Sequence, residues 1–188
     1  MNIAMDLQLP IFALVLIACL YGVTMKVADL LDEHGLHLFA GADLLFGVLW
    51  GICGGLLVLA DPVVANVLLA QMVAYIVRRR LDYVNHAIGA AIMIVTFLAS
   101  TAFAPVLFGV FGVTFLLFGA LRDYIGNVRT KRDWLYMINE PAWYYVIPPA
   151  IYGLVTGEWL LLVLLATYRV SYNIIKYTAP RWSKVHSV

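Results

Sequence analysis

Charged residues are scarce in this sequence. Asp, Glu, Lys and Arg make up only 12% of the 188 residues, whereas 64% are hydrophobic, and the mean hydropathy is +0.92. A soluble domain of this length could not bury so much apolar surface, so the composition excludes a soluble globular protein and predicts a polytopic membrane protein. The formal net charge of +1 gives no indication of nucleic-acid binding, and we expect no nucleic-acid partner.

Cysteine is also rare. Cys19 and Cys53 both lie inside apolar runs and form no CxxC pair, which favours packing roles over a disulfide or a metal site. The histidines form no HxxxH or HxxE pair, so a transition-metal site is not expected. The N-terminus MNIAMDLQLP lacks the basic region of a cleaved signal peptide, and we expect the first apolar run to be retained as a span.

The apolar residues fall into runs that are separated by charge, proline or glycine. A span across a bilayer needs about 20 residues. We predict an all-α, polytopic transmembrane helical bundle that forms one integral membrane domain over residues 1–188. Its seven predicted helices cover approximately residues 9–27, 44–60, 62–77, 87–103, 106–121, 141–156 and 158–176.

The basic residues lie on one side of this predicted bundle. All twelve Lys and Arg residues fall at one set of helix ends, whereas the turns near 61, 105 and 157 carry only Asp61 and Glu158. Because basic residues stay in the cytoplasm, this asymmetry predicts an outside N-terminus and a cytoplasmic C-terminus. We expect a plasma-membrane protein whose polar site is on the cytoplasmic face.

Three carboxylates follow the first predicted span. Asp29, Asp32 and Glu33 are spaced i, i+3 and i+4, so they share one face if the helix continues. Acidic side chains at a membrane helix end need a partner, and an oxygen-rich face suits a hard cation such as Mg²⁺. The alternative is a solvated cap where the helix leaves the membrane.

A short internal repeat places further polar residues at the same side. Residues 80–85 read RLDYVN and residues 121–127 read LRDYIGN. Each would bring an Asp-Tyr-Asn cluster to the cytoplasmic end of a helix, and repeat-built bundles often bind their ligands where such units converge. Asn66 and Gln71 lie within the third span, where interhelical hydrogen bonds are expected.

Two of these motifs resemble the sequence motifs of a known membrane-protein superfamily. Residues 122–127, RDYIGN, followed by Arg-Thr at 129–130, resemble the second aspartate motif of the UbiA-type membrane prenyltransferase superfamily. Residues 28–32, ADLLD, resemble its first motif. The sequence departs from the family at Ala28, where Asn is expected, and at Asn127, where Asp is expected. A chain that lacked the family's first and last helices would show this seven-span pattern.

The resemblance implies Mg²⁺-dependent prenyl transfer from an isoprenyl diphosphate or related membrane lipid. It implies that Asp29, Asp32 and Asp123 are catalytic, and that these three with Glu33 hold the metal. The metal would neutralise the leaving diphosphate, and basic groups would hold its other oxygens. The candidate substrate-binding residues are Lys26, Arg79, Asp82, Asn85, Arg122, Asn127, Arg169, Tyr172, Asn173 and Lys176.

Arg169 starts a polar stripe on the last predicted helix. Arg169, Tyr172, Asn173 and Lys176 are spaced i, i+3, i+4 and i+7. Arg169 lies about two turns inside the helix end, and an arginine at that depth faces the bundle interior. It either binds the substrate or forms a structural ion pair with a cytoplasmic aspartate. The run 78–80, Arg-Arg-Arg, also fits an ordinary topology determinant that contacts lipid headgroups.

Two other functions fit the same pattern. A small-solute or cation transporter, or a substrate-binding membrane subunit, would place polar groups near the bilayer midplane, and the second, fourth and fifth predicted helices supply few. The eroded motifs would also suit a non-catalytic relic of the prenyltransferase fold.

Overall fold

The computed structural model describes residues 8–33, 35–100, 103–128 and 141–179. The side chains of Glu33, Asn127, Val128 and Pro141 lie outside this description. Over the described ranges the chain is all-helical, which confirms the predicted class. The helices are α1 (Ile11–Glu33), α2 (Ala42–Ala60), α3 (Pro62–Val77), α4 (Val84–Ser100), α5 (Pro105–Val128), α7 (Ile147–Thr156) and α8 (Leu160–Thr178), and a π-helical turn, η1 (Pro141–Val146), precedes α7.

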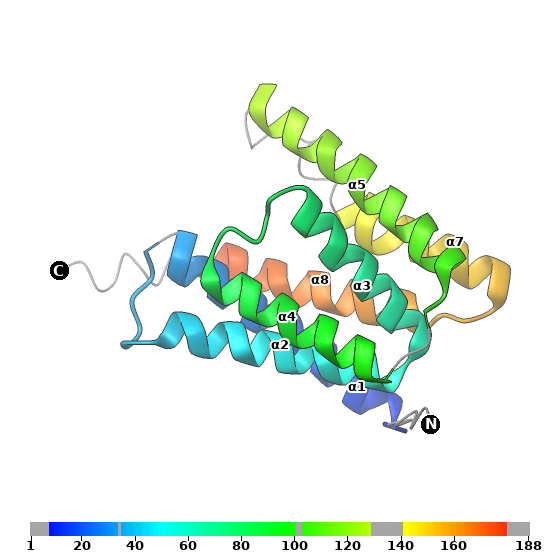
Figure 1. The fold of residues 1–188 in the computed structure, drawn as a ribbon, viewed down its shortest axis with the longest axis horizontal. Coiled ribbons are helices and arrows are strands. Elements are labelled where there is room, and N and C mark those ends of the chain that lie inside the picture. The colour runs from blue at the N-terminus through cyan, green and yellow to red at the C-terminus, as the bar shows by residue number, and fades with distance from the viewer. Residues whose placement is uncertain (1–7, 34, 101–102, 129–140, 180–188) are drawn as a thin grey trace.

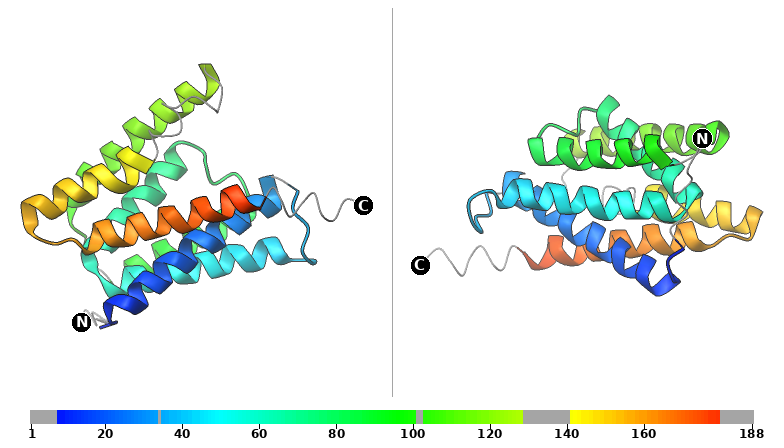
Figure 2. Two further views of the ribbon diagram at one scale, coloured as in Figure 1. Left: turned by 180° about the vertical axis from the view of Figure 1, so that it is seen from behind. Right: turned by 60° about the horizontal axis from the view of Figure 1, so that its bottom comes forward.

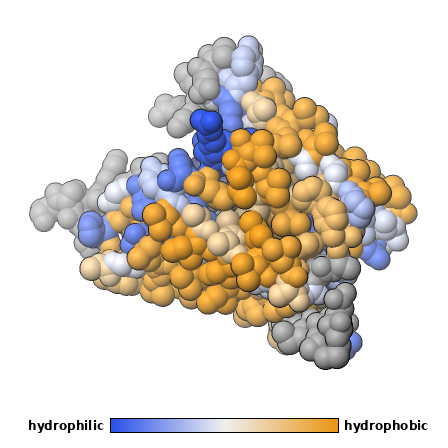
Figure 3. Space-filling model, in the orientation of Figure 1, coloured by the Kyte–Doolittle hydropathy of each residue, from blue (hydrophilic) through white to orange (hydrophobic). Residues whose placement is uncertain are grey.

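Three helices are long and apolar enough to cross a membrane by themselves. They cover Ile11–Asp32, Ala42–Ala60 and Pro105–Gly126, and α3 and α4 are shorter apolar helices. These lengths agree with a membrane protein. Large apolar side chains also cover much of the outer surface, and Figure 3 shows them over most of one face of the molecule.

Two helices are longer than the sequence analysis predicted. α1 continues to Glu33 instead of ending near residue 27, and α5 continues to Val128 instead of ending near residue 121. Both extensions contain charged residues, which the prediction had taken as helix ends. Asp, Glu and Arg are compatible with a helix interior, so charge marks a change of environment and not a helix end. The extensions carry Asp29, Asp32 and Asp123 on rigid helical backbone.

The helices form one bundle, in which α3 contacts α5, α2 and α4. α1 packs along both α2 and α8, α2 packs along α4, and α3 packs along α5 (Figure 1). η1 contacts both α8 and α5. Figure 2 shows α8 beside α1 when the molecule is seen from behind. The ends of α1, α3, α5 and α8, with the start of α4, therefore form the end of the bundle that we call the polar end.

Glycines allow the closest helix contacts. A Cβ atom at Gly89 of α4 would overlap the indole ring of Trp50 on α2, and one at Gly22 of α1 would overlap Ser171 on α8. Small residues are typical of helix interfaces in membranes, where backbones must approach closely to gain packing energy. Trp50 is fully buried as a result.

The turn from α3 to α4 contains an unusual backbone conformation. Arg79 has a φ of 54°, and the other described residues with positive φ are Gly35, Gly41 and Gly157. Arg79 donates its N–H to Ile76 O (3.0 Å), and Arg80 donates to Tyr75 O (2.9 Å). These two bonds form a Schellman motif, whose left-handed position normally holds glycine. A non-glycine residue there costs about 1 kcal/mol.

We expect Gly89→Ala to destabilise the bundle by roughly 1–3 kcal/mol, because Trp50 has no room to move away from a new methyl group. Gly112→Ala on α5 is the matched control, since its Cβ would meet no atom within 4 Å. That variant should be neutral or slightly stabilising, because alanine is the better helix former. Thermal unfolding of the two variants in detergent measures the difference. Equal melting temperatures would contradict the packing between α2 and α4.

Candidate functional site

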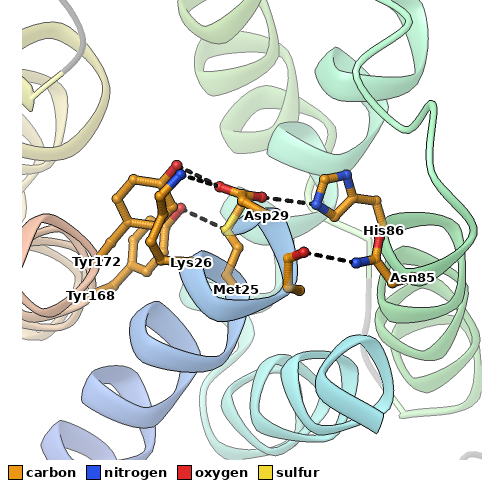
Figure 4. A network of polar contacts seen from close by, with 8 residues as sticks. Met25, Lys26, Asp29, Asn85, His86, Tyr168 and Tyr172 are labelled. Carbon is orange, nitrogen blue, oxygen red and sulfur yellow. Dashed lines mark hydrogen bonds and ion pairs between the residues drawn. The ribbon is translucent and has the colours of Figure 1, made fainter. Parts of the chain in front are cut away.

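The polar end contains a buried carboxylate that three side chains contact. Asp29 on α1 lies 3.2 Å from Lys26 Nζ, 2.8 Å from His86 Nε2 and 2.6 Å from the Tyr172 hydroxyl (Figure 4). Its side chain is only 9% exposed. A buried carboxylate needs such partners, because its desolvation is otherwise unfavourable by several kcal/mol. We call this group, from α1, α4 and α8, the Asp29 centre.

Further contacts fix the elements that meet at the Asp29 centre. Asn85 at the start of α4 donates its amide to Ala28 O on α1 (3.1 Å), and the Tyr168 hydroxyl contacts Met25 Sδ (3.1 Å). Figure 4 shows these contacts on either side of Asp29. The α4 and α8 backbones are therefore tied to the same turn of α1.

Two cations lie against the aromatic rings beside Asp29. Lys26 Nζ is 5.1 Å from the centre of the Tyr172 ring, and Arg169 Cζ is 5.2 Å from it. Arg169 Cζ is also 5.3 Å from the Tyr145 ring. Both cations are buried, Lys26 at 4% and Arg169 at 7% exposure. The predicted inward position of Arg169 is confirmed, and cation–π contacts of desolvated groups stabilise it there.

A second carboxylate lies at the end of α5. Asp123 accepts from Arg78 Nη2 (2.8 Å) and Nε (3.3 Å) and also from Arg80. Arg78 donates in addition to the Tyr144 hydroxyl (3.0 Å). Gly119 makes this possible, because a Cβ there would overlap the Arg78 guanidinium and the Tyr144 hydroxyl. We call this group the Asp123 centre.

The α3–α4 turn, residues 78–83, connects the two centres. Arg78 and Arg80 at its beginning bind Asp123. Tyr83 at its end packs edge-on against the His86 ring, with ring centres 5.9 Å apart, and His86 contacts Asp29. Asp29 and Asp123 share no hydrogen-bond or ion-pair partner in the described part of the chain. Two of the three predicted catalytic aspartates, Asp29 and Asp123, therefore lie in separate centres on either side of one turn.

The structure brings only part of the predicted site together. Lys26, Asp29 and Tyr172 meet in the Asp29 centre, and Asn85 and Arg169 lie beside it. Asp123 lies in the Asp123 centre. The other described candidates lie around the polar end: Asp32 half-buried on α1, Arg79 and Asp82 exposed in the α3–α4 turn, Arg122 half-buried on α5, and Asn173 and Lys176 half-buried on α8. Glu33 and Asn127 are on α1 and α5, but their side chains are outside the described set.

Sequence reasoning missed Arg78, His86 and Tyr144 as site residues. Arg78 was interpreted as a topology determinant, but its side chain is only 7% exposed. His86 was considered only as a metal ligand. Two sequence features point to these residues. Arg78 begins a basic run directly after an apolar helix, and His86 follows a polar Asn at a helix start. Neither signal specifies the distant aspartate that each residue contacts.

The described carboxylates do not form a site that suits bridging Mg²⁺. Among the residues that the structure describes, no group of three His, Cys, Asp or Glu side chains lies close enough to hold a metal ion. Asp29 and Asp123 also contact cationic side chains already. This donor set does not fit the metal that the resemblance implies, so we derive no reaction step through it. Magnesium binding stays a prediction from the sequence.

A separate polar group lies in the bundle interior. Gln71 Nε2 donates to the Tyr75 hydroxyl (2.9 Å) and to the Tyr145 hydroxyl (3.1 Å), which confirms its predicted interhelical bond. Asn66 Oδ1 accepts from Ala104 N (2.8 Å), just before α5. Gln71, Asn66 and Tyr145 are each at most 1% exposed.

Asp29→Asn should destabilise the protein by about 3–5 kcal/mol, because removing one partner of a buried ion pair leaves the Lys26 charge uncompensated. Asp32→Asn, one turn further along α1, is the control. It removes a half-buried carboxylate, and a change within about 0.5 kcal/mol is expected. Denaturant unfolding in detergent measures both. Similar small losses for the two variants would show that the Asp29 centre does not stabilise the fold.

The chain was compared with known proteins. No protein-family model matches it, no curated protein matches it, and no solved structure matches it. The resemblance to the UbiA-type prenyltransferase superfamily therefore depends on the two aspartate motifs and on the predicted seven-span pattern.

Proposed function

We propose that this protein is an integral membrane enzyme that binds the diphosphate group of an isoprenoid or related lipid at its polar end and transfers the prenyl group. The observation that supports this most is the set of buried cations at that end. Lys26 and Arg169 have exposures of 4% and 7%, and the side chain of Arg78 is 7% exposed. Each is fixed by a carboxylate or an aromatic ring.

Buried, fixed cations favour an anionic ligand. A diphosphate carries several negative charges, and the aspartates alone would repel it. Lys26 has three N–H donors, of which the described hydrogen bonds use one, so it can contact Asp29 and a phosphate oxygen together. Because Lys26 and Arg169 are on helices and Arg78 directly follows α3, little reorganisation is needed when the ligand binds.

The apolar surface explains how a prenyl tail would be accommodated. α4 and α5 expose large apolar side chains along their outer faces, among them Val95, Leu98, Val106, Val113 and Leu117. A lipid could keep its tail in the bilayer against such faces while its headgroup enters the polar end. In this proposal the cations neutralise the charge that develops on the diphosphate as the allylic carbon–oxygen bond breaks.

One observation favours transport as a second candidate. Gln71, Tyr75 and Tyr145 form a hydrogen-bonded group in the bundle interior, where the second half of α3 meets η1. Polar groups at that depth are typical of a translocation path. Uptake of a solute by vesicles that contain the protein, without turnover of prenyl diphosphates, would favour this candidate.

The proposal includes seven spans in the plasma membrane, with the N-terminus outside and the polar end in the cytoplasm. Single cysteines at positions 61, 105 and 157 should then react with a membrane-impermeant reagent from outside intact cells. A cysteine at position 82, in the α3–α4 turn, is the control and should react only after the cells are opened. Labelling of the first three positions only from the cytoplasmic side would contradict the orientation.

Arg169→Ala should weaken the binding of an isoprenyl diphosphate by about 2–3 kcal/mol, the scale of one charge-assisted hydrogen bond. Arg169→Lys should recover only part of this, because an ammonium group cannot form a bidentate contact. Affinity and melting temperature are measured on the same variants in nanodiscs. Unchanged affinity with a large fall in melting temperature would assign Arg169 to the scaffold and remove it from the site.

A further inference from the structure

The backbone conformation at position 79 favours glycine, so we attribute the arginine there to a role of its side chain. Its φ of 54° and the two Schellman hydrogen bonds of the turn would suit glycine better. At Gly35, Gly41 and Gly157, the other described positions with positive φ, the sequence does supply glycine. Backbone strain of this kind persists where the residue has another role.

The surroundings of Arg79 indicate what that role is. Arg78 and Arg80, its two neighbours, both bind Asp123. Arg79 is exposed near the start of the turn, and Tyr83 at the end of the same turn contacts His86 of the Asp29 centre. The strongly hydrophilic region in the upper part of Figure 3 lies where α3 ends and this turn begins in Figure 1. The turn thus carries an exposed arginine directly beside the two residues that bind Asp123.

We infer that Arg79 binds a phosphate group between the Asp29 and Asp123 centres. This deepens the proposed function and rests on it, since the phosphate would belong to the lipid diphosphate or to a free diphosphate. Arginine suits the task because its planar fork matches two phosphate oxygens, which lysine cannot do. The hydrogen-bonded turn, anchored by Arg78 and Arg80, holds the Arg79 backbone in place.

The test compares stability and binding for three variants of the full chain in phosphatidylcholine nanodiscs. Arg79→Gly suits the left-handed backbone and removes the charge, Arg79→Asn tolerates the same backbone with a short polar side chain, and Arg79→Lys keeps the charge. The probes are farnesyl diphosphate and inorganic diphosphate. We expect Arg79→Gly to raise the melting temperature by about 2–4 °C and to weaken binding tenfold or more.

Arg79→Asn should weaken binding equally with a smaller gain in stability, and Arg79→Lys should lose less affinity than either. Loss with both probes would identify the phosphate itself as the ligand, and loss with farnesyl diphosphate alone would identify a lipid-borne phosphate. Unchanged affinity in Arg79→Gly would overturn the inference, while the proposed function would stand if Arg169→Ala still weakened binding. If the unmodified protein bound neither probe, the proposed function and this inference would both fail.

Discussion

The contact between Asp29 and its three partners determines how this bundle is assembled at one end. A carboxylate this deeply buried in an apolar bundle needs hydrogen-bond donors, and Lys26, His86 and Tyr172 supply them from three helices. α1, α4 and α8 therefore have to converge with a defined register. Glycines allow the approach, since Gly22 brings α1 against α8 and Gly89 brings α4 against Trp50 of α2. The apolar packing and the polar centre thus depend on each other.

The second centre limits where α5 can lie. Asp123 accepts from Arg78 and Arg80, so the end of α5 is attached to the end of α3. At the other end of the helix pair, Asn66 accepts from the backbone just before α5. The turn between α3 and α4 consequently has both aspartates as neighbours, although they do not contact each other. A ligand that interacts with both centres would have to lie across this turn.

Sequence patterns predicted the all-helical class and the bounds of α3. α3 matches its predicted range because Pro62 starts it, with the Asp61 side chain accepting from Val64 N, and because the basic run follows it. The depth of Arg169 in an apolar run correctly indicated an inward side chain. The predicted ends of α1 and α5 are wrong, because charged residues are compatible with a helix interior and do not end these helices. The sequence does not predict the contact of Arg78 with Asp123 or of His86 with Asp29, because each pair is far apart in sequence. Both contacts depend on how the helices pack at glycines and aromatic rings.

The central claim is that an isoprenoid diphosphate binds at the polar end, across the α3–α4 turn. The most direct measurement is a structure of the protein in nanodiscs with a non-hydrolysable isoprenyl diphosphate analogue, determined once with Mg²⁺ and once with EDTA. The account predicts density for the diphosphate beside Lys26, Arg79 and Arg169 in both samples. Density only with Mg²⁺, bound directly by Asp29 and Asp123, would replace the cation-based site with the metal site of the superfamily. Density elsewhere in the bundle, or none, would contradict the account.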